Sequence, residues 1–104
     1  ECSPIVLFET MAAGVPFLSS RAGNSEEIAE WSQGGWTMPG TKDNNEWEHV
    51  DVSKGARLLS GLLAQPERLR AAGRAGHTAW KERFTWQHIA EEYAAQYDQL
   101  VSHA

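Results

Sequence analysis

Residues 1–20 read ECSPIVLFETMAAGVPFLSS, and their order of residue types predicts a helix followed directly by a strand. Ser3 is a good N-cap, Pro4 suits the first helical position, and Gly14 is placed to end the helix. We therefore expect a helix over residues 5–13. Because nearly all of its side chains are apolar, we expect it to be buried on most sides.

Short strands and helices alternate over the next part of the chain. A strand is expected over residues 15–20, and a helix should run from an Asn24 N-cap, in a capping-box pattern, to about Trp31. A second strand is expected over residues 36–38. Residues 39–49 are polar and rich in turn formers, which predicts an irregular surface loop.

From Asp51 onward the periodicity is helical throughout. A third helix has one face marked by Val52, Ala56, Leu59 and Leu63. Pro66 begins a fourth helix, and its small residues, which indicate close approach to a neighbouring element, are Ala72, Gly73 and Gly76. Thr85 should cap a fifth helix. Its apolar stripe requires a partner surface and consists of Trp86, Ile89, Ala90, Tyr93, Tyr97, Leu100 and Val101.

The order helix, strand, helix, strand and then helices is half of a doubly wound pattern. The sequence therefore predicts an α/β fold, namely a partial doubly wound, Rossmann-like domain with a helix-rich C-terminal part. Residues 1–104 would form this single partial domain. Two strands do not make a stable sheet, so we expect the missing strands upstream of Glu1. A first residue other than Met also favours a fragment of a longer protein.

Charge and composition exclude several classes of function. The formal net charge is -5 and no run of Lys or Arg occurs, which argues against nucleic acid as a partner. No apolar stretch reaches membrane-spanning length and no signal peptide is evident, so we expect a cytoplasmic protein. The four histidines lack metal-ligand spacing, and we expect no metal. The single cysteine, Cys2, is expected to be a small buried hydrophobe without chemistry.

Two carboxylates, Glu1 and Glu9, flank the start of the first helix. Glu1 would lie in the loop beside the free backbone N–H groups of Ile5 and Val6, where a phosphate group fits. Glu9 could accept two hydrogen bonds from a vicinal diol such as a ribose. The alternative is that Glu9 is a partly exposed helix residue, as a lone Glu usually is. We favour a binding role for Glu9 because its surround is apolar and an unpaired buried carboxylate is costly.

The same residues carry a resemblance to a known family. Residues 1–17 resemble the E-x7-E motif and the following EAMAxGxPV stretch of group 1 glycosyltransferases, also called glycosyltransferase family four. Residues 23–28, GNSEEI, resemble the family's glycine-then-xEI turn, and residues 83–97 resemble its C-terminal helix. Two departures are that Cys2 and Ser3 stand where many members have Gly and an aromatic residue, and that Asn24 replaces a second glycine.

This resemblance implies the downstream half of the donor-binding domain of a retaining glycosyltransferase with the two-domain GT-B architecture. Glu9 would hold the ribose of a nucleotide-diphosphate sugar, and Glu1, the candidate catalytic residue, would approach the transferred sugar. The diphosphate would face the backbone around Ser3, Pro4, Ile5 and Val6. The donor is a substrate, and no cofactor or metal is implied. The acceptor domain and the basic phosphate contacts would lie upstream, so the isolated chain is expected to be inactive.

Other interpretations stay open at this point. The C-terminal helix could pair two chains in a homodimer, as a non-catalytic oligomerisation module, or it could cross back to the missing N-terminal domain as in the resembled family. The reaction could be that of a GT-B-like nucleotide-sugar epimerase or phosphorylase. Peripheral membrane attachment through a lipid acceptor also stays open. Arg21 is expected to form a surface salt bridge rather than a phosphate contact, and the exposure of Trp36 and Trp47 is undecided.

Overall fold

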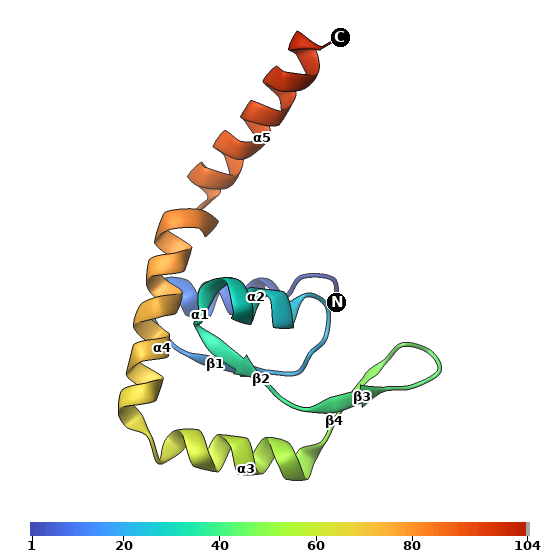
Figure 1. The fold of residues 1–104 in the computed structure, drawn as a ribbon, viewed down its shortest axis with the longest axis vertical. Helices are drawn as coiled ribbons and strands as arrows, with labels where there is room; N and C mark the ends of the chain where they lie inside the picture. The colour runs from blue at the N-terminus through green and yellow to red at the C-terminus, as the bar shows by residue number, and fades with distance from the viewer. Residues whose placement is uncertain (104) are drawn as a thin grey trace.

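A computed structural model describes residues 1–103 of the chain. Figure 1 shows a small body of helices and short strands from which the last helix projects. The elements in chain order are α1 (Ile5–Ala12), β1 (Phe17–Ser19), α2 (Ser25–Ser32), β2 (Gly35–Thr37), β3 (Gly40–Lys42), β4 (Glu48–Val50), α3 (Val52–Leu63), α4 (Pro66–Ala79), the π-helical turn η1 (Trp80–Phe84) and α5 (Trp86–Ser102). The expected mixed α/β class with a helix-rich C-terminal part is confirmed.

The strands β1 and β2 pair in parallel, with Phe17 opposite Gly35 and Ser19 opposite Thr37. The helix α2 connects them, so residues 17–37 form one β-α-β unit. The two predicted strands and the helix between them are therefore confirmed, although β1 is shorter than the predicted 15–20 and β2 begins one residue before the predicted 36–38. The carboxyl ends of both strands lie at the same edge of this small sheet.

The region predicted to be an irregular loop, residues 39–49, instead contains an antiparallel hairpin of β3 and β4. Its turn is closed by the Asp43 carboxylate, which accepts from the backbone N–H groups of Asn45 at 2.8 Å and Trp47 at 3.0 Å. A hydrogen bond with His49, followed by that from the Trp47 amide, lowers the pKa of the Asp43 carboxyl below its ordinary value. The sequence lacks the Asn-Gly or Asp-Gly pair that announces a tight hairpin, which is why this one was missed.

The first helix ends as predicted but begins differently. Gly14 has φ +71°, and the amides of Gly14 and Val15 donate to the carbonyls of Met11 and Thr10, which is a Schellman motif. At the other end Pro4 rather than Ser3 occupies the N-cap position, and no side chain caps the helix. The predicted Ser3 cap, with Pro4 as the first helical residue, is wrong.

The expectation that α1 is buried on most sides is also wrong. Only Leu7 and Met11 of α1 are buried, whereas Ile5 and Val6 are 61% and 54% exposed. The molecule measures 54 × 39 × 16 Å. Because a helix is about 10 Å across, the shortest dimension holds at most two layers of elements. Neighbouring elements therefore cover α1 on one face only.

The core is correspondingly small and centres on four side chains from three elements: Leu7, Met11, Phe17 and Ile28. Partly buried residues that pack against it are Phe8, Ala29, Trp80 and Phe84. Apolar contact between α1, β1, α2 and η1 is thus the main favourable term that holds the body together.

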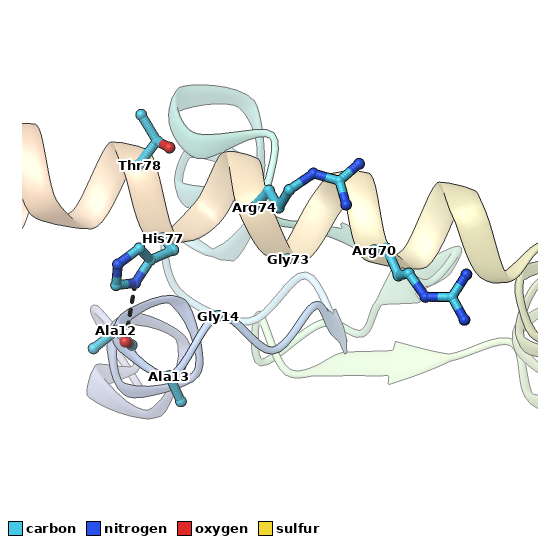
Figure 2. Close-up of a pocket in the computed structure, with 8 residues that line it drawn as sticks. All are labelled: Ala12, Ala13, Gly14, Arg70, Gly73, Arg74, His77 and Thr78. Carbon is cyan, nitrogen blue, oxygen red and sulfur yellow. Dashed lines mark hydrogen bonds between the residues drawn. The ribbon is translucent and has the colours of Figure 1, made fainter.

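The helix α4 crosses this body through residues that have almost no side chain, as the sequence predicts. A Cβ atom added to Gly73 would lie 2.4 Å from the carbonyl oxygen of Gly14 (Figure 2), and one added to Gly76 would lie 3.1 Å from the Cα atom of Gly34. These two glycines let the backbone of α4 approach the end of α1 and the start of β2 directly.

The last helices differ in how they meet the body. The face of α3 marked by Val52, Leu59 and Leu63 is exposed, and α3 instead buries Gly55 and Leu62. Thr85 caps α5 as predicted, since its hydroxyl accepts from the His88 amide at 3.3 Å. No residue of α5 through Ser102 is buried, and its apolar stripe is open to solvent along a helix that leads away from the body (Figure 1).

Replacing Gly73 with alanine should destabilise the protein, because the new methyl group would meet the Gly14 carbonyl, a backbone atom that cannot move aside. We expect a loss of about 1–3 kcal/mol in the free energy of unfolding, measured by urea denaturation. Gly61→Ala is the matched control, since a Cβ atom there meets nothing within 4 Å. It should stabilise α3 by about 0.5–1 kcal/mol. Equal effects of the two substitutions would contradict the close crossing of α4.

Candidate functional site

The segment before α1 lies on the turn that follows β1. The amide of Asn24 donates to the carbonyl of Cys2 at 2.9 Å. Gly23 has φ +57°, and a Cβ atom there would lie 2.5 Å from the Cys2 carbonyl oxygen and 2.6 Å from that of Glu1. Only glycine allows this approach, so Gly23 sets where the chain enters α1, at the carboxyl end of β1.

The predicted capping box at the start of α2 is not formed. The side chain of Asn24 makes no capping hydrogen bond, and its oxygen atom is buried without a partner among residues 1–103. Its φ and ψ of −98° and 28° lie outside the extended region that an N-cap residue adopts. The hydrogen bond between the Asn24 amide and Cys2 instead ties this residue to the N-terminal segment.

The N-terminus of α1 has unpaired donors, as the sequence predicts. Leu7 donates to the Pro4 carbonyl at 3.2 Å, whereas the amides of Ile5 and Val6 find no acceptor among residues 1–103. Both residues are exposed, so these amides lie at a helix end open to solvent. Such donors, together with the helix dipole, favour an anion.

Glu9 is exposed rather than surrounded by apolar side chains. The desolvation argument for its function is therefore wrong, because α1 is covered on the opposite face from Glu9. The carboxylate borders a groove of about 500 Å³ between α1 and the start of α5. The groove brings together three predicted site residues, Ser3, Ile5 and Glu9, while Glu1, Pro4 and Val6 do not line it.

An aromatic wall of this groove was missed in the sequence. Trp80 and Phe84 of η1 and Trp86 of α5 form it, and the ring of Phe84 meets that of Phe8 edge to face at 5.3 Å. The spacing of Trp80 and Phe84, four residues apart, was the available signal that both rings share a helix face. Because the wall is apolar and Glu9 is charged, the groove offers stacking surface next to a hydrogen-bond acceptor.

The candidate catalytic residue, Glu1, is exposed. No side-chain hydrogen bond or ion pair joins it to another residue within the described range 1–103. Its position follows from the backbone contacts of Glu1 and Cys2 with Gly23. The structure therefore leaves the carboxylate open and its catalytic role untested.

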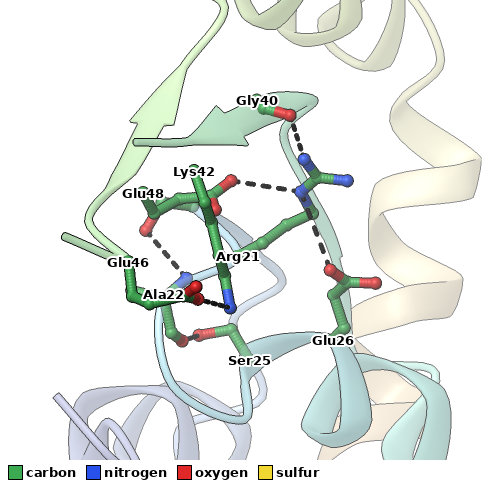
Figure 3. Close-up of polar contacts among 9 residues, drawn as sticks. Arg21, Ala22, Ser25, Glu26, Gly40, Lys42, Glu46 and Glu48 are labelled. Carbon is green, nitrogen blue, oxygen red and sulfur yellow. Dashed lines mark hydrogen bonds and ion pairs between the residues drawn. The ribbon is translucent and has the colours of Figure 1, made fainter. Parts of the chain in front are cut away.

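Arg21 forms salt bridges, as predicted, and contacts three groups (Figure 3). Its Nε lies 3.2 Å from the Glu48 carboxylate and 3.6 Å from that of Glu26, and its guanidinium also donates to the carbonyl of Gly40. The Glu48 side chain is only 7% exposed. Arg21 thus fastens the hairpin to the carboxyl end of β1 and is not free to meet a phosphate.

The structure also places the other residues considered in the sequence. Cys2, expected to be buried, is exposed, because the segment before α1 lies at the surface. Trp47 is 70% exposed at the end of the hairpin turn, whereas Trp36 is half-buried with the guanidinium of Arg68 5.4 Å from its ring centre. Over residues 1–103, His, Cys, Asp and Glu side chains nowhere gather in threes as a metal site requires. The helices of that range are all too short or too polar to cross a bilayer.

Substituting Arg21 with glutamine should loosen the hairpin, because the carboxylate of Glu48 would lose its charged partner while staying largely buried. We expect about 1–3 kcal/mol of destabilisation and faster amide exchange in β3 and β4. Lys42→Gln removes only an exposed pair with Glu46 and should change stability by less than about 0.5 kcal/mol. Exchange in the hairpin that matches the wild type would refute the role of Arg21.

Curated proteins match most of this chain. Spore coat protein SA of Bacillus subtilis is 25% identical over 93 residues, which are 89% of this chain and 22% of that protein. The MMP alpha-(1->4)-mannosyltransferase of Mycolicibacterium hassiacum is 30% identical, over 90% of this chain and 21% of the transferase. Alpha-maltose-1-phosphate synthase of Mycolicibacterium smegmatis is 32% identical, over 85% of this chain and 22% of the synthase.

These matches cover only a small part of each relative. The chain spans 21–22% of the length of these proteins. No protein-family model and no solved structure matches it. Over the part of each relative that this chain matches, the similarity supports a relationship to glycosyltransferases.

Proposed function

We propose that this chain is half of the donor site of a retaining glycosyltransferase of the GT-B type and that it binds a nucleotide-diphosphate sugar at the N-terminus of α1. The observation that carries the proposal is the pair of unpaired amides of Ile5 and Val6 beside the groove that Glu9 borders. In open α/β sheets, ligands bind outside the carboxyl ends of the strands, which is where the N-terminal segment enters α1.

The helix end would hold the diphosphate. Donors at a helix N-terminus stabilise a negative charge without the cost of reorganising solvent, and this matters most as the diphosphate leaves. The backbone of Ser3, Pro4, Ile5 and Val6 would face the phosphate oxygens. Arg21 does not serve here, because it is held by Glu48 and Glu26. Basic contacts would come from upstream residues.

Glu9 would hold the ribose. An exposed carboxylate without a protein partner can accept both hydrogen bonds of a vicinal diol, and the aromatic side chains beside it exclude water from one side. Glu1 would approach the hydroxyls of the transferred sugar and is the proposed catalytic residue. Its backbone contact with Gly23 would fix the direction from which it reaches the donor.

The whole protein would then be a cytoplasmic hexosyltransferase with its acceptor domain upstream. The nucleotide-diphosphate sugar would be its donor substrate, and it would need no cofactor. The names of the mannosyltransferase and the maltose-1-phosphate synthase favour glycosyl transfer over epimerisation. The isolated chain would bind donor without turning it over.

Removal of the Glu9 carboxylate should weaken donor binding. In ligand-observed NMR with a panel of nucleoside diphosphates and their sugar conjugates, we expect Glu9→Gln to lower affinity for the preferred ligand about tenfold, the loss of one or two hydrogen bonds to a charged group. Glu30→Gln is the matched control, since Glu30 is an exposed helical carboxylate outside the groove.

Binding that is equally strong in Glu9→Gln and the wild type would remove the ribose role from Glu9. Failure of every nucleotide to bind a folded wild-type chain would overturn the proposal of a half-site.

A second candidate role is association of two chains through α5, which the exposure of its stripe favours. Tyr93, Tyr97 and Leu100 would pair with their copies across a two-fold axis. In sedimentation equilibrium, Tyr97→Lys should weaken a dimer at least about tenfold, since it places a charge in an apolar interface. Gln99→Lys, on the opposite face of α5, should leave it unchanged. A wild-type chain that stays monomeric would rule out this role.

A further inference from the structure

A second groove lies at the opposite end of α1 from the proposed donor site. It has a volume of about 610 Å³ and runs between residues 12–14 and the exposed face of α4. Figure 2 shows the residues of α4 that line it, with His77 pointing toward Ala12 and Thr78 pointing to the other side of the ribbon; the set is Arg70, Arg74, His77 and Thr78. The first three are separated by four and three residues, so they are neighbours on the helix surface.

Every titratable side chain that lines this groove is basic. The chain as a whole carries a formal net charge of -5, so the positive surface is a local concentration and not a reflection of composition. Lys81 lies one turn further, in an adjoining hollow that also contains His77, Thr78 and the acidic Glu82, so the single sign of charge is confined to the first groove. A groove with one sign of charge attracts ions of the opposite sign.

Only some of these basic side chains have a partner within the described residues 1–103. The Nδ1 atom of His77 lies 3.1 Å from the carbonyl oxygen of Ala12, where it satisfies the C-terminus of α1. Arg70 pairs with Glu67 on the preceding turn at the exposed surface. Arg74 has no carboxylate within 4 Å among residues 1–103, so its guanidinium keeps its full set of donors available.

Two glycines, Gly14 and Gly73, are part of the lining of the groove. Gly73 and Gly14 meet backbone to backbone there, and a Cβ atom added to Gly14 would find nothing within 4 Å. The space beside the two arginines is therefore open to a group the size of a phosphate.

We propose that this groove binds phosphoryl groups, with Arg74 as the principal contact and Arg70 and Thr78 as supporting donors. Guanidinium groups match the oxygens of phosphate in charge and in the geometry of paired hydrogen bonds. A soluble phosphate ester and a lipid headgroup present the same chemistry to these residues. Ala12 borders both grooves, but the two arginines lie beside the C-terminus of α1, whereas the donor diphosphate is proposed to bind at its N-terminus. The phosphoryl proposal does not depend on the donor proposal.

The test uses two probes and a matched pair of variants. Inorganic pyrophosphate is titrated into a ¹⁵N-labelled chain, and binding to this groove is measured from the amide shifts of residues 70–78, separately from any shifts at the N-terminus of α1. Vesicles of phosphatidylcholine with and without phosphatidylglycerol are tested by co-sedimentation. Arg74→Glu should weaken binding of the probe that the groove accepts by about tenfold or more, and Arg74→Gln by a smaller factor. Arg57→Glu makes the same charge change on the exposed surface of α3, outside the groove, and should alter binding less than about twofold.

The outcomes separate the two sources and the proposal itself. Pyrophosphate binding that Arg74→Glu abolishes assigns the groove to soluble phosphate esters. Binding only to anionic vesicles, lost in the same variant, assigns it to lipid headgroups. The proposal is overturned if neither probe binds, if binding survives Arg74→Glu, or if Arg57→Glu weakens it equally. Circular dichroism of each variant confirms that the fold is intact.

Discussion

The structure depends on a backbone contact between α4 and the body at two glycines. Gly73 meets the carbonyl of Gly14, and Gly76 lies against Gly34, so the helix axis comes closer than side chains would permit. Through this crossing α4 contacts α1, α2 and β2 at once. A core centred on four buried hydrophobic side chains is too small to hold those elements together without this close backbone contact.

The crossing also gives the two ends of α1 different surroundings. Its C-terminus is closed by the Schellman turn at Gly14 and by the hydrogen bond with His77 from α4. Its N-terminus has no side-chain cap and keeps two amides unpaired. The carbonyl groups at the C-terminus of this eight-residue helix are thus hydrogen-bonded and lie beside a basic groove. The amides at its N-terminus, the open end, lack acceptors among residues 1–103 and are electrostatically suited to an anion. The proposed donor site uses the open end.

Local chemistry in the sequence predicted the elements well, because their signals act within a few residues. Pro66, Thr85 and Gly14 begin or end helices as expected, and the glycines of α4 indicated the close crossing. Two local predictions failed, namely the Ser3 cap and the Asn24 capping box. The failures in predicted burial depend on contacts between distant segments. The burial of α1 and α3 was misjudged because periodicity identifies an apolar face without showing whether another element covers it.

The candidate site divides in the same way. The free amides of Ile5 and Val6 follow from helix geometry alone and were predicted. The exposure of Glu9 and the aromatic wall beside it arise from where η1 and α5 pass α1, which no local pattern encodes. The hairpin was missed because a side chain, Asp43, supplies the turn that Asn-Gly usually provides.

The central claim, that a diphosphate binds at the open end of α1, is tested most directly by amide chemical shifts. A ¹⁵N-labelled chain is titrated with a nucleoside diphosphate, and every backbone amide is followed. The account predicts that the largest shifts occur at Ile5 and Val6, with smaller ones at Glu9 and its neighbours in the groove. Shifts confined to α4 around Arg74, or the absence of any shift in a folded chain, would contradict it.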